Sequence, residues 1–192
     1  MQSFGEQSRQ LIKVIQGLDS LGIDATLPSL PKFVVVGDQS HGKSSIIEAV
    51  CDITLPRAAG TCTRCPFRIT TTASKDAKTP WSCKISLLCR YRYNSKANRE
   101  YPKWEDTHSE SATEFATIYD KRLLENALRL AQIAILNPHL MPAEVLQANN
   151  LDVGMGVGFS PNIVSLDIEG PELPELALID LPGAINVAPN ET

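Results

Sequence analysis

The segment 32–50 constrains the fold of this chain more than any other part of the sequence. Residues 32–36 (KFVVV) form an apolar run that predicts a buried β-strand, and residues 45–50 (SIIEAV) predict the start of a helix. Between them, residues 37–44 (GDQSHGKS) match the pattern G-x-x-x-x-G-K-[ST]. A strand, a glycine-containing loop and a helix in this order predict an α/β fold with a loop that wraps around phosphate groups.

The residue types in this loop meet the chemical demands of phosphate binding. Gly37 and Gly42 let the backbone approach phosphate oxygens closely, and the amides of the loop and of the helix N-terminus then point at the anion. Lys43 is predicted to reach the β- and γ-phosphates, and the Ser44 hydroxyl to ligate Mg²⁺. The alternative interpretation is a chance glycine turn between a strand and a helix.

Length and composition exclude several classes of protein. The 192 residues suggest one domain, long enough for a hydrophobic core. The net charge of −4 argues against a general nucleic-acid binder. No apolar run approaches the roughly 18 residues of a membrane span, and residues 1–6 (MQSFGE) resemble neither a signal peptide nor a myristoylation site. The expected location is therefore cytoplasmic, with peripheral membrane contact left open.

The cysteines argue against a complete disulfide framework, because their number, five, is odd. Cys62 and Cys65 have C-x-x-C spacing and, with Cys83 and Cys89, offer the ligands of a thiolate zinc site. The last two cysteines lie in a strand-like run without the tight spacing of zinc ribbons. Reduced, unrelated thiols are therefore the favoured interpretation.

Apolar periodicity predicts the elements of the first half of the chain. Residues 6–21 carry apolar side chains at helical spacing, and this helix packs either on the chain's own sheet or on a partner segment. Residues 67–72 and 81–91 alternate as two strands, which are expected to pair with each other.

The second half of the chain is predicted in the same way. Residues 93–104 are polar and predict an exposed loop, with a basic and aromatic contact surface as the alternative. Helical spacing over 110–136 ends at an Asn-Pro pair, and 142–147 predict a short helix with Pro in its first turn. Residues 162–168 and 176–179 are predicted strands, and the acidic turn between them favours an antiparallel pair.

A second chemical signal follows the last predicted strand. Residues 180–183 (DLPG) place an aspartate at the strand's carboxyl end and a glycine three positions later. Asp180 can hold a Mg²⁺-bound water, and the Gly183 amide can meet a γ-phosphate and move when that phosphate leaves. Such a site also needs a threonine in a loop between the two motifs. Thr61 and Thr63 both lie in that stretch, and spacing does not choose between them.

Together these motifs resemble the dynamin superfamily of large GTPases, closest to its dynamin-like and Mx-like members. The resemblance rests on residues 38–45 (DQSHGKSS), 55–57 (LPR), 63–66 (TRCP) and 180–183 (DLPG), in this order. It covers the N-terminal helix and the first half of the GTPase domain, roughly residues 6–190.

The resemblance implies a role for each matching residue. Thr63 is implied to be the switch I threonine that binds Mg²⁺ together with Ser44 and Asp180. Gln39 is implied to position the attacking water, and Ser40 to contact the phosphates and help hold a monovalent cation. The expected catalytic residues are Gln39, Ser40, Lys43 and Thr63. The expected nucleotide contacts are Gly37, Asp38, Gln39, Ser40, His41, Gly42, Lys43, Ser44, Ser45, Asp180 and Gly183.

The resemblance also implies a fold and a domain organisation. The fold is α/β: a P-loop NTPase three-layer sandwich with a mixed, mostly parallel sheet and helices on both faces, incomplete at its C-terminal side. Residues 1–28 resemble part of the bundle signalling element, and residues 29–192 the first half of a dynamin-type GTPase domain. The guanine-reading motif [TN]-K-x-D is not found in the chain, so the choice of base is not encoded in it.

The expected function is GTP binding and Mg²⁺-dependent GTP hydrolysis as part of a dynamin-like large GTPase, in membrane remodelling or organelle dynamics. The expected cofactors are GTP or GDP, Mg²⁺ and a monovalent cation. Expected partners are a second GTPase domain in the full-length protein and a membrane or the cytoskeleton, but no nucleic acid. The alternatives are a truncated, non-catalytic fragment or regulator that docks on a partner and, more weakly, a P-loop ATPase or kinase.

Overall fold

The computed structural model describes residues 33–35, 42–51, 53, 55, 63–74, 76, 79–96, 103–147, 156–171 and 173–182. The helix predicted for residues 6–21 and the domain boundary after residue 28 lie outside the described residues. Within the described ranges, no helix has the length and apolar character needed to cross a membrane.

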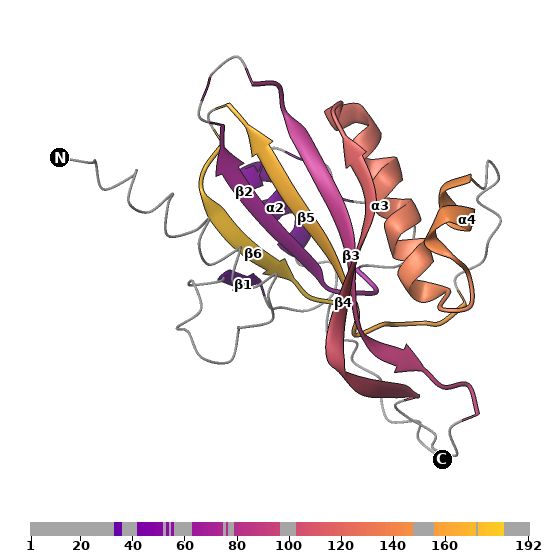
Figure 1. Ribbon diagram of the computed structural model, residues 1–192. Coiled ribbons are helices and arrows are strands. Elements are labelled where there is room, and N and C mark those ends of the chain that lie inside the picture. The colour runs from indigo at the N-terminus through magenta and orange to yellow at the C-terminus, as the bar shows by residue number, and fades with distance from the viewer. Residues whose placement is uncertain are drawn as a thin grey trace.

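The described strands form a six-stranded sheet in the order β1–β6–β2–β5–β3–β4 (Figure 1). In chain order they are β1 (Phe33–Val35), β2 (Phe67–Ala73), β3 (Ser82–Tyr93), β4 (Trp104–Ile118), β5 (Ile163–Gly170) and β6 (Leu176–Asp180). β1 pairs with β6 in parallel, and β2 with β5, whereas β2–β6, β3–β5 and β3–β4 are antiparallel. This mixed sheet with its helices confirms the predicted α/β, P-loop type of fold. Antiparallel pairs outnumber parallel ones in the described part, because β3 and β4 form a hairpin and β5 runs antiparallel to β3.

The helices are α2 (Lys43–Cys51), α3 (Lys121–Leu136) and α4 (Pro142–Gln147). α3 begins after Asp120, whose carboxylate accepts a hydrogen bond of 3.0 Å from the backbone amide of Arg122 and so caps the first turn. It ends just before Asn137, as the Asn-Pro pair predicts, and α4 coincides with the predicted short helix.

One face of the sheet carries the hydrophobic core. α2 and α3 lie behind the sheet in Figure 1 and share a single cluster of buried side chains with it. Ile47 of α2 and Leu128 of α3 are 1% and 0% exposed, and they belong to the same cluster as Ile69 of β2 and Leu166 of β5. The core therefore joins the helix that follows the phosphate-binding motif to the middle of the sheet.

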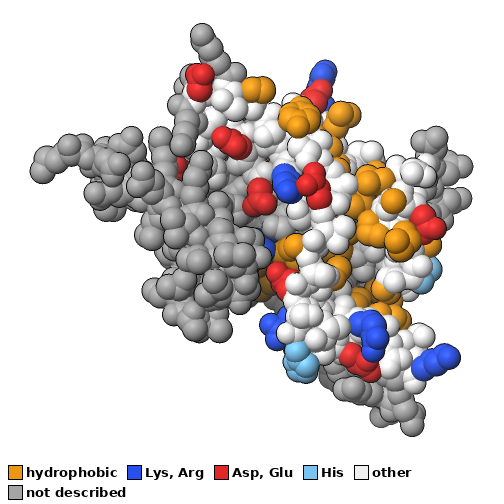
Figure 2. Space-filling view, in the orientation of Figure 1, with side chains coloured by type: hydrophobic (Ala, Val, Ile, Leu, Met, Phe, Trp, Pro, Cys, Tyr) orange, Lys and Arg blue, Asp and Glu red, His pale blue; other side chains and the backbone are white. Residues whose placement is uncertain are grey.

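The other face of the sheet carries charged side chains, which Figure 2 shows side by side on the front of the molecule. The ammonium group of Lys84 on β3 lies 3.0 Å from the carboxylate of Glu114 on β4. The pKa of Asp167 on β5 lies above its ordinary value, because its partial burial outweighs the effect of the positive charges of Arg68 and Lys84. Opposite charges thus alternate across neighbouring strands of this face.

The prediction of a helix over 110–136 is wrong for its first third, because residues 110–118 belong to β4. Serine and threonine are frequent there, at 111, 113 and 117, and both residue types favour a helix less than the leucines and alanines of α3 do. Pairing with β3 provides hydrogen-bond partners for the backbone amide and carbonyl groups of this segment. Tyr119 is 72% exposed and Leu123 is 59% exposed, so these two members of the supposed apolar face do not pack in the core.

Two predicted strand pairings are also wrong. β2 and β3 do not pair, because β5 lies between them, and β5 and β6 do not pair, because β2 lies between them. These neighbours are set by contacts distant in sequence, which short turns do not reveal.

Residues 93–104 were predicted as a loop, but the first and last residues of this segment belong to strands. Tyr93 closes β3 and Trp104 opens β4, and their ring centroids lie 5.2 Å apart in an edge-to-face contact. Arg92 faces an acidic neighbour, with its guanidinium 3.5 Å from the carboxylate of Glu105. This arginine therefore does not add net positive charge to a basic contact surface.

Gly156 approaches the C-terminus of α3 so closely that a larger residue does not fit without adjustment. A Cβ atom at this position would lie 2.6 Å from the Oδ1 atom of Asn137 and 3.2 Å from the carbonyl oxygen of Leu136. Asn137 cannot easily move aside, since it is 2% exposed and its Nδ2 atom donates to the carbonyl of Ile133 at 2.9 Å.

We therefore expect Gly156→Ala to lower the free energy of unfolding by about 1–3 kcal/mol, the usual cost of overpacking. The matched control is Gly158→Ala, because a Cβ atom at Gly158 meets nothing within 4 Å. Urea denaturation of both variants checks this expectation. Equal stabilities would show that the segment at 156 is not held against α3.

Candidate functional site

The strands that precede the two sequence motifs are neighbours in the sheet. β1 and β6 are parallel neighbours, and Val35 is in register with Asp180. In the chain β1 is followed by the phosphate-binding motif, and β6 ends at Asp180, so the carboxyl ends of the strands that precede the two motifs lie side by side. This is where ligands bind in open α/β sheets.

Gly42 gives direct evidence for the backbone conformation at the start of α2. Its φ angle is +79°, in the left-handed region that glycine adopts without strain. Its carbonyl accepts a hydrogen bond of 3.1 Å from the amide of Ile46, so the first helical turn forms directly on this glycine. Lys43, the next residue, is half-buried at the helix N-terminus. A lysine and the positive end of a helix dipole together favour an anion at this point.

Thr63 and Asp180 are in direct contact although 117 residues separate them in the sequence. The Thr63 hydroxyl donates a hydrogen bond of 3.0 Å to the Oδ2 atom of Asp180. Asp180 is only 1% exposed at the end of β6. A hydroxyl and a carboxylate supply the hard oxygen ligands that Mg²⁺ prefers, so the chemistry of these two side chains fits that ion.

Backbone contacts hold the segment that carries Thr63. The amide of Ser160 donates to the carbonyl of Arg64 at 3.1 Å, and the amide of Val164 donates to the carbonyl of Pro66 at 3.0 Å. Cys65, between these two residues, is fully buried. Thr63 is therefore attached on its C-terminal side to the start of β5.

Gln132 is a site neighbour that the sequence interpretation missed. It lies on the buried face of α3, is 6% exposed, and its side chain hydrogen-bonds the Cys65 thiol. The signal was present in the sequence, because a glutamine interrupts an otherwise apolar helical face. Gln132 connects α3 to the loop that places Thr63.

The described cysteines are buried or half-buried free thiols. The pKa of Cys65 is raised to about 12, chiefly by burial; the hydrogen bond with Gln132 lowers it and the negative charge of Asp180 raises it. Burial likewise raises the pKa of Cys83 to about 12 and that of Cys51 to about 11. No group of three or more His, Cys, Asp or Glu side chains in the described part could hold a metal ion. The zinc alternative thus has no support there, and Cys62 lies outside the described residues.

We expect Cys65 and Cys83 to react with iodoacetamide at pH 8 at least about 100-fold more slowly in the folded chain than in urea, because the reactive thiolate is rare when the pKa is raised. Peptide mapping by mass spectrometry, with the urea-unfolded chain as the control, identifies the modified residues. Rapid modification of Cys65 in the folded chain would show that the loop after Thr63 is open to solvent.

Similarity to known proteins indicates the family of this chain. A family model described as "Dynamin family" matches residues 33–192. The chain belongs to the dynamin family. It is similar to the interferon-induced GTP-binding protein Mx of Solea senegalensis, with 34% identity over 187 residues that cover 97% of this chain and 23% of that protein. It is also similar to the interferon-induced GTP-binding protein Mx2 of Sus scrofa, with 31% identity over 185 residues, 96% of this chain and 20% of that protein. The chain therefore spans between a fifth and a quarter of the length of these relatives.

The structure of this dynamin-family chain places part of the predicted site. Gly42, Lys43, Thr63 and Asp180 are described, and Ser45 is exposed on the first turn of α2. The side chain of Ser44 lies outside the described part, as do residues 37–41, Thr61 and Gly183. The predicted roles of Gln39, Ser40 and the other undescribed residues stay predictions.

Proposed function

We propose that this chain binds GTP and forms part of a site for Mg²⁺-dependent GTP hydrolysis. The observation that carries the proposal is the hydrogen bond of 3.0 Å between the Thr63 hydroxyl and the carboxylate of Asp180. It brings a threonine of one segment to the end of β6, beside the strand that leads into the phosphate-binding motif. A GTPase needs this combination of a metal-sensing threonine and a strand-end carboxylate.

Each residue has a role that follows from its place. Lys43, at the N-terminus of α2, compensates the charge of the β- and γ-phosphates. Thr63 and Asp180 present oxygen atoms to the cation side of the phosphates. By family resemblance, the Ser44 hydroxyl is a further ligand of the cation. Mg²⁺, when bound, neutralises charge that develops on the phosphate oxygens. By family resemblance, Gln39 positions the attacking water, and Ser40 contacts the phosphates and supports a monovalent cation.

The relatives support guanine as the base, since both are GTP-binding proteins by their names. We extend that to this chain as part of the proposal. Self-association through the GTPase domain, action in membrane remodelling or organelle dynamics, and a cytoplasmic location are further proposals, which rest on the family.

Calorimetric titration of the chain with GTP and with ATP, each with and without Mg²⁺, tests the proposal. We expect GTP to bind more tightly with Mg²⁺ than without it, and Asp180→Asn to weaken the Mg²⁺-dependent binding by about tenfold or more, as loss of a charged ligand of the cation should. Asp120→Asn is the matched control, because asparagine caps a helix as well as aspartate does. Equal competition by ATP would favour an ATPase or kinase, and no binding of either nucleotide would favour a regulator without catalysis.

A further inference from the structure

The side chain of Asn162, just before β5, forms hydrogen bonds with the backbone of β3. The backbone pairing of β5 with β3 ends at Ile163 and Leu88. Beyond that point the Oδ1 atom of Asn162 accepts hydrogen bonds from the amides of Arg90 and Tyr91, at 3.1 and 2.9 Å, and its Nδ2 atom donates to the carbonyl of Tyr91 at 2.9 Å. The amide group therefore continues the ladder with a side chain where the β5 backbone no longer reaches β3.

The backbone amide of Asn162 is connected to the candidate site through Ser160. Its backbone amide donates to the Ser160 hydroxyl at 3.2 Å, and the amide of Ser160 donates to the carbonyl of Arg64 at 3.1 Å. Arg64 directly follows Thr63 in the chain. Both Ser160 and Asn162 are buried, at 4% and 6% exposure. We name residues 159–162 the strap, because they connect β3 to the segment that carries Thr63.

A second contact fixes the strap to β4. The indole Nε1 atom of Trp104 donates to the carbonyl of Phe159 at 3.2 Å, and the Trp104 ring packs against Tyr93. The strap is thus held by both strands of the hairpin, and it holds the backbone beside Thr63.

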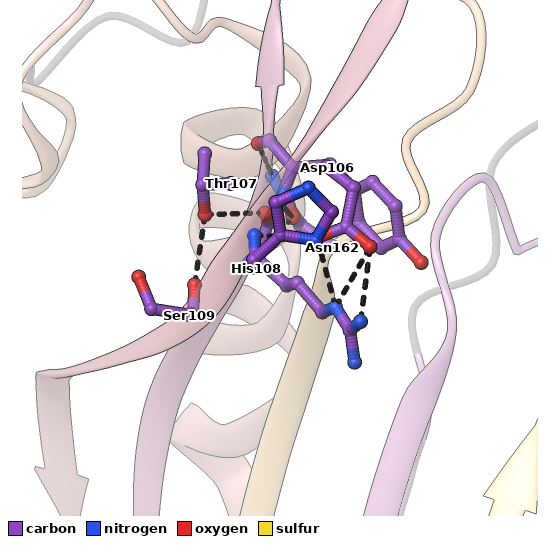
Figure 3. Close-up of polar contacts among 7 residues, drawn as sticks. Asp106, Thr107, His108, Ser109 and Asn162 are labelled. Atoms are coloured by element: carbon purple, nitrogen blue, oxygen red, sulfur yellow. Dashed lines mark hydrogen bonds and ion pairs between the residues drawn. The ribbon is translucent and has the colours of Figure 1, made fainter.

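The part of the hairpin that binds the strap is itself tightly connected (Figure 3). We call residues 90–93 of β3 and 104–108 of β4 the distal hairpin. The guanidinium of Arg90 donates to both carboxylate oxygens of Asp106, at 2.9 to 3.2 Å, and the Thr107 hydroxyl donates to the carbonyl of Arg90 at 2.7 Å. Arg90 and the amide of His108 keep the pKa of Asp106 at about 2, so this carboxylate stays charged at neutral pH. The two strands of the distal hairpin therefore act on the strap as one unit.

We propose that Asn162 is a positioning residue for Thr63, and that through the strap the distal hairpin controls how tightly the site binds a Mg²⁺–nucleotide. The inference rests on the proposed function, since it concerns the same Thr63. Coupling between two sites is reciprocal, so nucleotide binding must also change the surroundings of the distal hairpin. Trp104 lies in that hairpin and is a natural fluorescent reporter of such a change.

The test uses the whole chain with Trp81→Phe, which leaves Trp104 as its single tryptophan. The probe is Mg²⁺ with the non-hydrolysable β,γ-imido analogue of GTP. We expect the probe to change the Trp104 fluorescence, and Asn162→Ala to remove that change and weaken calorimetric affinity about tenfold, within the range of known coupling energies. The matched control is Asn126→Ala, an exposed asparagine of α3 whose Oδ1 atom accepts a hydrogen bond from Arg129 and which lies outside the distal hairpin and the strap.

The melting temperature of each variant separates positioning from a merely structural role. Asn162→Ala with a lower melting temperature but unchanged affinity would overturn the inference while leaving the proposed function intact. If Asn162→Ala does not fold, Trp104→Phe takes its place, since it removes the hydrogen bond to Phe159 and keeps an aromatic ring beside Tyr93. Its readout is calorimetric affinity, because the reporter tryptophan is gone, and unchanged affinity in that variant would also overturn the inference. Failure of the unmodified chain to bind the analogue would contradict the proposed function itself, and the inference with it.

Discussion

Lys43→Ala is expected to bind GTP about 100-fold more weakly than the unmodified chain, because a hydrogen bond to a charged group contributes up to about 3 kcal/mol and each 1.4 kcal/mol corresponds to about tenfold in affinity. Lys43 is the first residue of α2 and follows Gly42, whose left-handed backbone starts the helix. In the proposed complex its ammonium group therefore meets the phosphate groups at the positive end of the helix dipole. Alanine keeps the helix but leaves the phosphates without this charge. Calorimetric titration with GTP and Mg²⁺ measures the effect.

Lys84→Ala is the matched control for this prediction. Lys84 is a lysine of the sheet face, 3.0 Å from Glu114, with half of its side chain exposed. Exposed ion pairs contribute little to stability, and this one lies on β3, away from the β1–β6 edge. We expect its nucleotide affinity to stay within about twofold of the unmodified chain, as for a neutral surface substitution. Equal affinities of the two variants would contradict the role that we assign to Lys43.

Leu166→Ala is expected to lower the free energy of unfolding by about 2–5 kcal/mol, the usual cost of removing a buried leucine and leaving a cavity. Leu166 is 0% exposed in β5, in register with Ile69 of β2 and Ile85 of β3. It therefore packs at the centre of the sheet, between the strands that join the core to the candidate site. Urea denaturation followed by circular dichroism measures the loss.

The chain offers a matched leucine for comparison. Leu123 of α3 is 59% exposed, so Leu123→Ala removes the same atoms without opening a cavity, and we expect a change within about 0.5 kcal/mol. A similar destabilisation by both substitutions would show that the core described here does not carry the stability of the chain.

Local features of the sequence were sufficient to predict much of the secondary structure of this protein and its family. The strand before the phosphate-binding motif, the helix after it, and the strands β2, β3, β5 and β6 follow from apolar patterns that depend only on neighbouring residues. The predicted burial of the first of these strands is wrong, since Phe33 and Val34 of β1 are 59% and 50% exposed. The cap at Asp120 is the local signal that separates β4 from α3, but apolar helical spacing continues across it and predicts one longer helix. The family also followed from motifs, since each motif is a short run whose chemistry does not depend on the rest of the chain.

The candidate site could be predicted only in part. The motifs named Thr63 and Asp180 separately, but sequence spacing left Thr61 equally open, and only the fold shows the Thr63 hydroxyl on the Asp180 carboxylate. Gln132 and Asn162 act through contacts with residues far away in the chain, so no local pattern assigned them a partner.

The sequence by itself determined the class of fold, the phosphate-binding motif and the residue types offered to a nucleotide, because these depend on backbone periodicity and on side-chain chemistry over a few residues. Only the tertiary structure decided which strands are neighbours, why residues 110–118 are a strand rather than a helix, and which distant side chains meet. The physical reason is that strand pairing joins hydrogen-bonding groups across long stretches of chain. The order β6–β2–β5–β3 is therefore chosen by the packing of the whole core.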